Sequence, residues 1–172
     1  AGAGVSGSQG VSGISVLSNF AGTLMPHYVK IKCHIEDVYS EDVDYTEDQD
    51  GIRVFGIETT PIQDGNCVIS GTFKNCWGRS IKAQRPDCKV INSAFIRTTG
   101  NSTGAGNTEV DFQRGAGIAK NLTCTYRNFQ PVTVVNSFSN NANEGLFSVE
   151  DIDINVSGTT LDQVVQRFAQ AT

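Results

Sequence analysis

The chain has 172 residues, the size of one ordinary globular domain, so a single core is the simplest expectation. Its net charge of −5 argues against a nucleic-acid-binding protein, which needs a basic surface to neutralise phosphates. No apolar run reaches the roughly 18 residues that cross a bilayer, so we expect neither nucleic acid nor membrane insertion. Charged residues make up only 18% of the chain and glycine occurs 18 times, which favours an all-β protein with many turns.

From residue 14 onward, two kinds of short segment alternate along the chain. The first kind begins at Ile14, Ile52, Ser80, Thr108 and Val132, and the second kind at Ile31, Ile69, Ile91, Leu122 and Ile152. Each segment alternates apolar and polar residues and is followed by turn residues, as β-strands are. The pair recurs about every 30 residues, which predicts a solenoid of about five coils over residues 1–158, with residues 1–13 as a flexible, Gly/Ser-rich start. A β-sandwich or jelly roll is the alternative, but such folds rarely repeat one two-part unit in order.

The second kind of segment carries a small residue at its middle position. These residues are Cys33, Gly71, Ser93 and Cys124. We expect the coil to bend there, because a narrow interior accepts a small side chain where a leucine would not fit. Asn75 then follows the bend of its segment, and asparagine suits a turn that needs left-handed backbone.

An acidic segment interrupts the first coil at residues 36–50. It contains Glu36, Asp37, Glu41, Asp42, Asp44, Glu47, Asp48 and Asp50. We interpret it as a solvated loop that leaves the coil. A Ca²⁺ site is the alternative, although "DYTEDQDG" only loosely resembles the spacing of a calcium-binding loop. The chain is otherwise expected to need no cofactor.

The five cysteines are an odd number, so they cannot all pair within one chain. No CxxC motif is present, and neither His27 nor His34 lies at zinc-finger spacing from a cysteine pair. We therefore expect the cysteines to pack as small buried apolar residues and predict no metal site.

The last segment, residues 159–172, changes its period. Leu161, Val164, Val165 and Phe168 are spaced as on one face of an amphipathic helix. We predict a short C-terminal helix that caps the open end of the solenoid or lies at an oligomer contact.

The stretch "NCVISGTFKNCWGRSIKAQRPDCKVINSAFIRTT" resembles the right-handed parallel β-helix of the pectate-lyase-like superfamily, and most of all bacteriophage tailspike and tail-fibre depolymerases. The resemblance implies an all-β, right-handed, single-stranded parallel β-helix. It brings no catalytic signature, because Ala116 stands where polygalacturonase-like members carry a histidine and "RSIK" precedes "GNTEVDF" instead of following it. That family's catalytic residues are therefore not carried over.

A column of polar residues is predicted on the outer face of the first kind of segment. When Ile52, Ile81 and Val110 point inward, the residues that follow them stack outward. We predict a glycan-binding surface that consists of Arg53, Trp77, Arg79, Lys82, Gln84, Gln113 and Arg114. Amides pair with sugar hydroxyls, and arginine and lysine pair with sugar carboxylates.

Two reaction types would suit such a surface. Glu109 and Asp111 lie two residues apart on one strand, roughly 6 to 7 Å, which makes them the best candidates for the carboxylate pair of a glycoside hydrolase. A polysaccharide lyase would instead use Lys82, Arg53 or Arg114. Whether the chain is an enzyme is left open at this point.

The leading hypothesis is a segment of a phage tailspike or tail fibre, in the virion tail, that binds a bacterial surface polysaccharide; cleavage of that polysaccharide by the full protein is left open. Five coils make a short stack, so we expect a homotrimer whose partners supply further burial. The alternatives are a non-enzymatic structural or adhesive shaft of a virion or cell surface and, third, a cellular polysaccharide lyase or hydrolase that is secreted or lies at the cell surface.

Overall fold

The computed structural model describes residues 12–17, 28–38, 49–55, 66–85, 88–98, 108–113, 117–127, 132–137, 148–157 and 164–165. These residues form strands and no helix, so the described part of the chain contains no membrane-spanning helix. The prediction of an all-β protein is confirmed.

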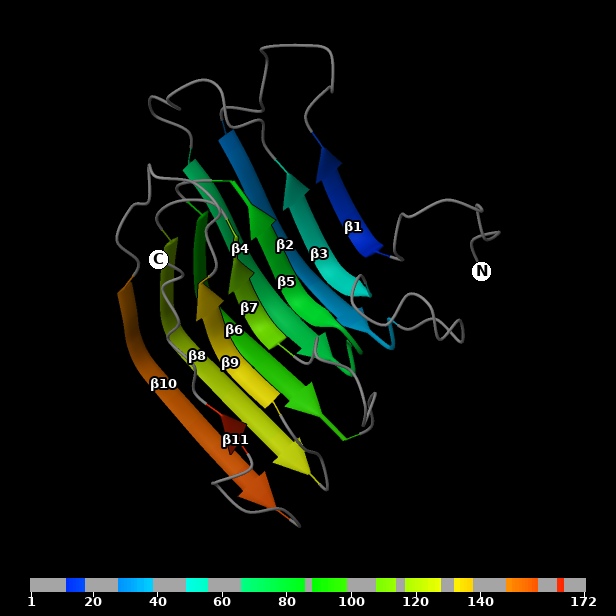
Figure 1. The fold of residues 1–172 in the computed structure, drawn as a ribbon, viewed down its shortest axis with the longest axis vertical. Coiled ribbons are helices and arrows are strands. Elements are labelled where there is room, and N and C mark those ends of the chain that lie inside the picture. The colour runs from blue at the N-terminus through cyan, green and yellow to red at the C-terminus, as the bar shows by residue number, and fades with distance from the viewer. Residues whose placement is uncertain are drawn as a thin grey trace.

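The strands form two parallel sheets, which we call sheet A and sheet B. Sheet A contains β1 (Ser12–Leu17), β3 (Asp50–Phe55), β5 (Arg79–Gln84), β7 (Thr108–Phe112), β9 (Val132–Ser137) and β11 (Val164–Val165). Sheet B contains β2 (Tyr28–Glu36), β4 (Asn66–Lys74), β6 (Cys88–Arg97), β8 (Gly117–Arg127) and β10 (Ser148–Ser157). In both sheets the strands follow one another in chain order, from the blue end to the orange end of the molecule (Figure 1).

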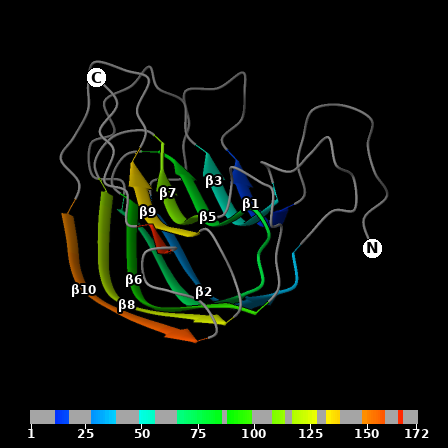
Figure 2. The same cartoon turned by 60° about the horizontal axis from the view of Figure 1, so that its bottom comes forward.

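The chain passes alternately through the two sheets. Odd-numbered strands pair only with odd-numbered strands and even-numbered strands only with even-numbered ones within the described residues. Parallel neighbours always need a crossover connection, and here the crossover contains a strand of the opposite sheet. Figure 2 shows the two sheets as separate layers that face each other.

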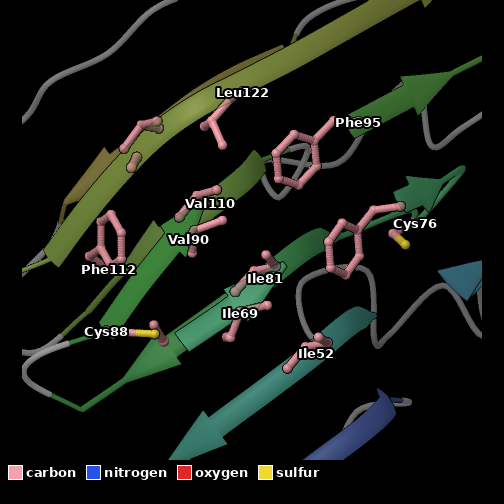
Figure 3. Close-up of a cluster of buried hydrophobic side chains, with 14 of the residues drawn as sticks. Ile52, Ile69, Cys76, Ile81, Cys88, Val90, Phe95, Val110, Phe112 and Leu122 are labelled. Atoms are coloured by element: carbon pink, nitrogen blue, oxygen red, sulfur yellow. The ribbon is translucent and has the colours of Figure 1, made fainter. Parts of the chain in front are cut away.

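The core lies between these layers. Ile52, Ile81 and Val110 are register partners in sheet A, and each is 0% exposed. Ile69 and Val90 are partners in sheet B and are equally buried (Figure 3). Burial of each such side chain contributes about 1.5 to 3 kcal/mol. The predicted inward positions of Ile52, Ile81 and Val110 are confirmed.

The strands of sheet B bend, and the bend uses left-handed backbone. Asn92 in β6, Asn121 in β8 and Asp151 in β10 have φ angles of 50°, 53° and 54°. Asparagine and aspartate tolerate this conformation better than other non-glycine residues. In β4 the bend contains Gly71, with a φ of 154°, which pairs with Ser93, the residue after Asn92. Figure 2 shows the bend clearly in β6, β8 and β10.

The register between β4 and β6 shifts at this bend. Ile69 pairs with Val90, whereas Gly71, two residues later, pairs with Ser93, three residues later. The strand β6 therefore accommodates one extra residue, and Asn92 with its left-handed φ lies within that extra span.

Part of the predicted repeat alignment is wrong between β6 and β8. Leu122, aligned with Ile91 in the sequence, pairs instead with Ser93. Likewise Cys124, expected at the bend, pairs with Phe95. A slip of two residues keeps every side chain on the same face of a strand, so the alternating pattern could not reveal it.

Asn75 forms the turn that the sequence predicted for it. Its φ is 51°, and its Nδ2 donates to Oδ1 of Asp37 in the preceding repeat at 3.2 Å. Its own Oδ1 accepts from the backbone N–H of Thr98 in the following repeat at 2.9 Å. Asn75 thus links three successive repeats through side-chain hydrogen bonds.

The two ends of the chain differ from expectation. Val164 and Val165 form β11, paired in parallel with Val132 and Thr133, so the predicted helix is wrong at these two residues; the rest of 159–172 lies outside the described residues. Valine is β-branched and favours strands, and a short isolated helix is marginal in water. The edge of β9 also offers backbone groups with which these two residues can pair.

At the other end β1 begins at Ser12, inside the segment predicted as a flexible start, of which residues 1–11 lie outside the described part.

Candidate functional site

The polar column predicted on sheet A exists in register. Arg53 pairs with Lys82, Lys82 with Asp111, and Asp111 with Asn136. We call these four residues the polar column. Four successive strands, β3, β5, β7 and β9, each supply one member because each contributes the residue that follows its inward isoleucine or valine.

The middle of the polar column is much less accessible than the sequence suggested. Lys82 is 6% exposed and Asp111 is 2% exposed, whereas Arg53 and Asn136 at its ends are half-buried. Gln84 and Gln113, two residues after Lys82 and Asp111, are also half-buried. The side chains that a ligand can reach in this conformation are therefore at the ends and along one side of the column.

The carboxylate of Asp111 is held by three donors. Oδ2 accepts from Nε of Arg79 at 2.6 Å and from Nε2 of Gln113 at 2.7 Å, and Oδ1 accepts from Nδ2 of Asn136 at 2.9 Å. Bonds to an ionised partner are the stronger kind. Asp111 thus organises its neighbours from three strands or strand ends, and little of its hydrogen-bonding capacity remains for a substrate.

Arg79 and Arg53 take different positions beside the column. The side chain of Arg79 is 14% exposed and lies between Asp111 and Asp50, whose nearest oxygen is 3.6 Å from Nη1. Arg53 donates from Nε to Oε1 of Gln84 at 3.0 Å, and its guanidinium lies 6.0 Å from the ring centre of Phe55. Arg53 is therefore positioned by an amide and an aromatic ring, with no carboxylate among these contacts.

Glu109 lies in a different environment from Asp111. It is 0% exposed, and Oε1 accepts from Nε of Arg97 at 2.7 Å while Oε2 accepts from Nη2 of Arg97 at 3.2 Å. The hydroxyl of Ser80 also donates to Oε2. We call Ser80, Arg97 and Glu109 the buried ion-pair cluster. The Arg97 guanidinium further donates to backbone carbonyls of two residues, Gly78 and Thr108.

The two carboxylates predicted as a catalytic pair therefore engage separate partners. Glu109 bonds to Arg97 at the end of β6, and Asp111 bonds to Arg79 at the start of β5. Neither has an exposed face in this conformation. Their catalytic role stays a prediction, but it would require both ion pairs to open first.

The thiols around the buried ion-pair cluster are poorly acidic. Burial raises the pKa of Cys76 and of Cys124 to about 12, and the carboxylate of Glu109 adds to the effect. Burial also raises the pKa of the Tyr126 hydroxyl well above its ordinary range. These two thiols and this hydroxyl therefore stay uncharged at neutral pH.

These pKa shifts predict a loss of stability in alkali. The folded protein holds the protons of Cys76 and Cys124 more tightly than the unfolded chain, in which a thiol titrates near 9.0. The contribution of these two thiols to the free energy of unfolding should therefore be constant below about pH 9 and fall between pH 9 and 12, by up to about 1.4 kcal/mol per pH unit for each thiol. Urea unfolding at a series of pH values measures this, and Cys76→Ser should make the fall shallower. Stability that stays flat up to about pH 11 would contradict the assignment.

The other predicted site residues are spread more widely. Trp77 is half-buried in the turn between β4 and β5, and its backbone N–H donates to the carbonyl of Val38 at 3.0 Å. Arg114 lies outside the described residues. Trp77 thus belongs to the turn, outside the polar column itself.

Most of the acidic segment at 36–50 also lies outside the described residues, at 39–48. Of its described members, Glu36 pairs with Lys74, Asp37 accepts from Asn75, and Asp50 is buried beside Arg79. The Lys74 ammonium holds the pKa of Glu36 below its usual range. Within the described ranges, no three His, Cys, Asp or Glu side chains gather as metal ligands.

Sequence reasoning missed three residues that organise this region, Ser80, Arg97 and Asn136. Arg97 follows Ser93 and Phe95 in strict alternation, so its inward orientation could have been counted from the sequence. A charged residue at an inward position requires a buried partner of opposite charge. The inward position of Arg97 therefore predicts a buried acidic partner, and in the structure that partner is Glu109.

Comparison with known protein families, with curated proteins and with solved structures finds no match to this chain.

Proposed function

We propose that the two sheets are faces of a right-handed, single-stranded parallel β-helix, and that the chain is a segment of a phage tailspike or tail fibre that binds bacterial surface polysaccharide. Support for the β-helix comes from the regular alternation of strands between two parallel sheets. Support for glycan binding comes from the sequence resemblance and, in the structure, from the polar column on sheet A. On this proposal the segment lies in the virion tail and faces the bacterial surface.

The observation that carries the binding proposal is the row of half-buried polar groups along sheet A. Arg53 in β3, Gln84 at the end of β5 and Gln113 directly after β7 present a guanidinium and two amides, on strands that lie about 4.8 Å apart. Guanidinium groups bind the carboxylates of acidic sugars in a bidentate manner, and amides bond to hydroxyls. A repeating row of such groups suits a polymer better than a compact small molecule.

We propose that the protein binds polysaccharide and that Glu109 and Asp111 do not cleave it. A hydrolase needs one carboxyl group to donate a proton to the leaving oxygen and the other to act on the sugar or on water. The carboxylate of Glu109 accepts hydrogen bonds from Arg97 and Ser80, and the carboxylate of Asp111 accepts from three donors. Opening either ion pair would leave a buried charge without its partner, which costs several kcal/mol.

A structural or adhesive shaft is the second candidate function. The observation that favours it is the burial of Lys82 and Asp111 in the middle of the polar column, where the protein's own side chains satisfy the carboxylate. In a shaft, the column would serve to hold successive strands in register. Glycan binding at its ends is what distinguishes the two functions.

Polysaccharide binding separates these candidates. Purified capsular and O-antigen polysaccharides are titrated into the protein, and products are examined for new reducing ends or unsaturated uronates. We expect saturable binding to an acidic polysaccharide and no cleavage. Cleavage that is abolished by Asp111→Asn in a folded protein would contradict binding without chemistry, and no binding to any polysaccharide tested would favour the shaft.

Arg53→Ala tests the location of the binding surface. Loss of one charged hydrogen bond of about 1.5 to 3 kcal/mol should weaken binding roughly tenfold to a hundredfold. Lys30→Ala is the matched control, because Lys30 is exposed on β2 of sheet B and its removal changes the net charge equally. If both variants weaken polysaccharide binding to the same extent, the net charge of the protein causes the binding and the polar column is not the binding surface.

We also propose that the segment functions as a homotrimer. The described repeats are few, and a solenoid buries its inner faces only by stacking. Sedimentation analysis of the purified protein should give three times the mass of the chain. A well-folded monomer in dilute solution would contradict this part of the proposal.

A further inference from the structure

Two cysteines meet between adjacent strands of sheet B. Cys67 is at the start of β4 and Cys88 is the first residue of β6, and the two are register partners. Both are 0% exposed, and the thiol of Cys88 donates to the sulfur of Cys67 at 3.4 Å. Both thiols are reduced in this structure, as are the other three.

We propose that Cys67 and Cys88 form a reversible disulfide that cross-links β4 to β6. Register partners in neighbouring strands have Cα atoms roughly 4.7 to 4.9 Å apart, which lies within the usual range of about 4.4 to 6.8 Å for a disulfide. The sulfurs must approach from 3.4 Å to a bond length of about 2.05 Å, a movement that side-chain rotation can supply. Side chains of parallel register partners point the same way, so the bond would be strained and readily reduced.

The surroundings make this pair more reactive than the other thiols. The hydrogen bond from Cys88 lowers the pKa of Cys67, and the nearby positive charge of Arg85 adds to this effect. Burial raises the pKa of Cys76 and Cys124 to about 12. The thiolate is the attacking species in disulfide exchange, so Cys67 is the favoured nucleophile.

The reaction needs an oxidant, and a small disulfide such as oxidised glutathione supplies it. The Cys67 thiolate attacks one sulfur of oxidised glutathione and releases one glutathione thiolate. The Cys88 thiolate then attacks the Cys67 sulfur of the mixed disulfide and releases the second glutathione. Two protein thiols lose two protons and two electrons in total, and one oxidised glutathione becomes two reduced molecules.

Access to the buried pair requires only limited opening. Because both residues lie at the beginnings of their strands, separation of the first residue pairs of β4 and β6 would expose them while Ile69, Phe73 and Phe95 stay packed. The bond would then fasten one repeat to the next at the end of sheet B opposite to the Phe73–Phe95 stack.

Thiol counting under denaturing conditions tests the proposal on the whole chain. The reduced protein should show five free thiols, and after treatment with oxidised glutathione followed by its removal it should show three, with the two lost from Cys67 and Cys88 in peptide mapping. Cys76→Ser is the matched control and should lose two of its four thiols in the same way. Cys88→Ser should stop at a glutathione adduct on Cys67.

Two results would overturn the proposal. One is a treated protein that keeps five free thiols, and the other is a map that places the bridge between any other pair or between two chains. Mapping of the parent protein decides between these outcomes even if a cysteine variant fails to fold.

Discussion

Glu109→Gln is expected to lower the free energy of unfolding by about 3 to 5 kcal/mol, because it leaves the guanidinium of Arg97 buried without a counter-charge. The side chains of Arg97 and Glu109 are 1% and 0% exposed, so water cannot replace the lost carboxylate. The substitution also replaces an acceptor of the Ser80 hydroxyl and the Arg97 guanidinium with an amide that has only one acceptor oxygen. Urea unfolding at constant m-value measures the change.

Glu36→Gln is the matched control for this prediction. Glu36 pairs with Lys74 at the surface, where the side chains are 38% and 35% exposed, so the same chemical change should leave stability close to that of the parent. Arg97→Met combined with Glu109→Leu should recover much of the loss, because it removes both buried charges together. A Glu109→Gln protein as stable as Glu36→Gln would contradict the structural role and reopen the catalytic one.

Gly71→Ala should be the most damaging single-methyl change in sheet B, with a cost of about 3 kcal/mol or more. The φ of Gly71 is 154°, a region that other residues rarely adopt, and a Cβ built there would lie 2.0 Å from the carbonyl oxygen of Cys33. That oxygen belongs to the backbone of β2, the neighbouring strand, so relief would require the two strands to separate. Thermal and urea unfolding measure the loss.

Ser70→Ala, one residue earlier in the same strand, is the control. Ser70 is half-buried on the opposite face of β4 from Ile69, and the change removes an atom instead of adding one. It should alter stability by no more than about 0.5 kcal/mol. Equal losses for Gly71→Ala and Ser70→Ala would show that the bend is not where the structure places it.

Much of sheet A could be predicted from the sequence, because its strands are short and β3, β5 and β7 each carry two inward apolar residues in alternation. Ile52, Ile81 and Val110 defined the alignment, and the register of Arg53 and Lys82 followed from it. Sheet B was harder because its longer strands bend. An extra residue near Asn92 moves the buried positions of β6 from 88 and 90 to 93, 95 and 97, so one uninterrupted alternation does not describe the whole strand.

The candidate site was predictable in position but not in exposure. The sequence placed Lys82 and Asp111 in one column, and the structure agrees. Asp111 accepts hydrogen bonds from Arg79, Gln113 and Asn136, residues that approach from other strands or strand ends. Such packing between distant segments is not encoded in the alternation of any single strand. Glu109 was misjudged for the same reason, since its partner Arg97 is contributed by the opposite sheet.

The most direct test of the proposed function is a crystal structure of the protein soaked with oligosaccharides from an acidic bacterial surface polysaccharide. We predict sugar density along sheet A, with a sugar carboxylate at Arg53 and hydroxyls at Gln84 and Gln113, and with the Arg97–Glu109 pair still closed. Sugar bound on sheet B, or bound at Glu109 with that ion pair open, would contradict the account.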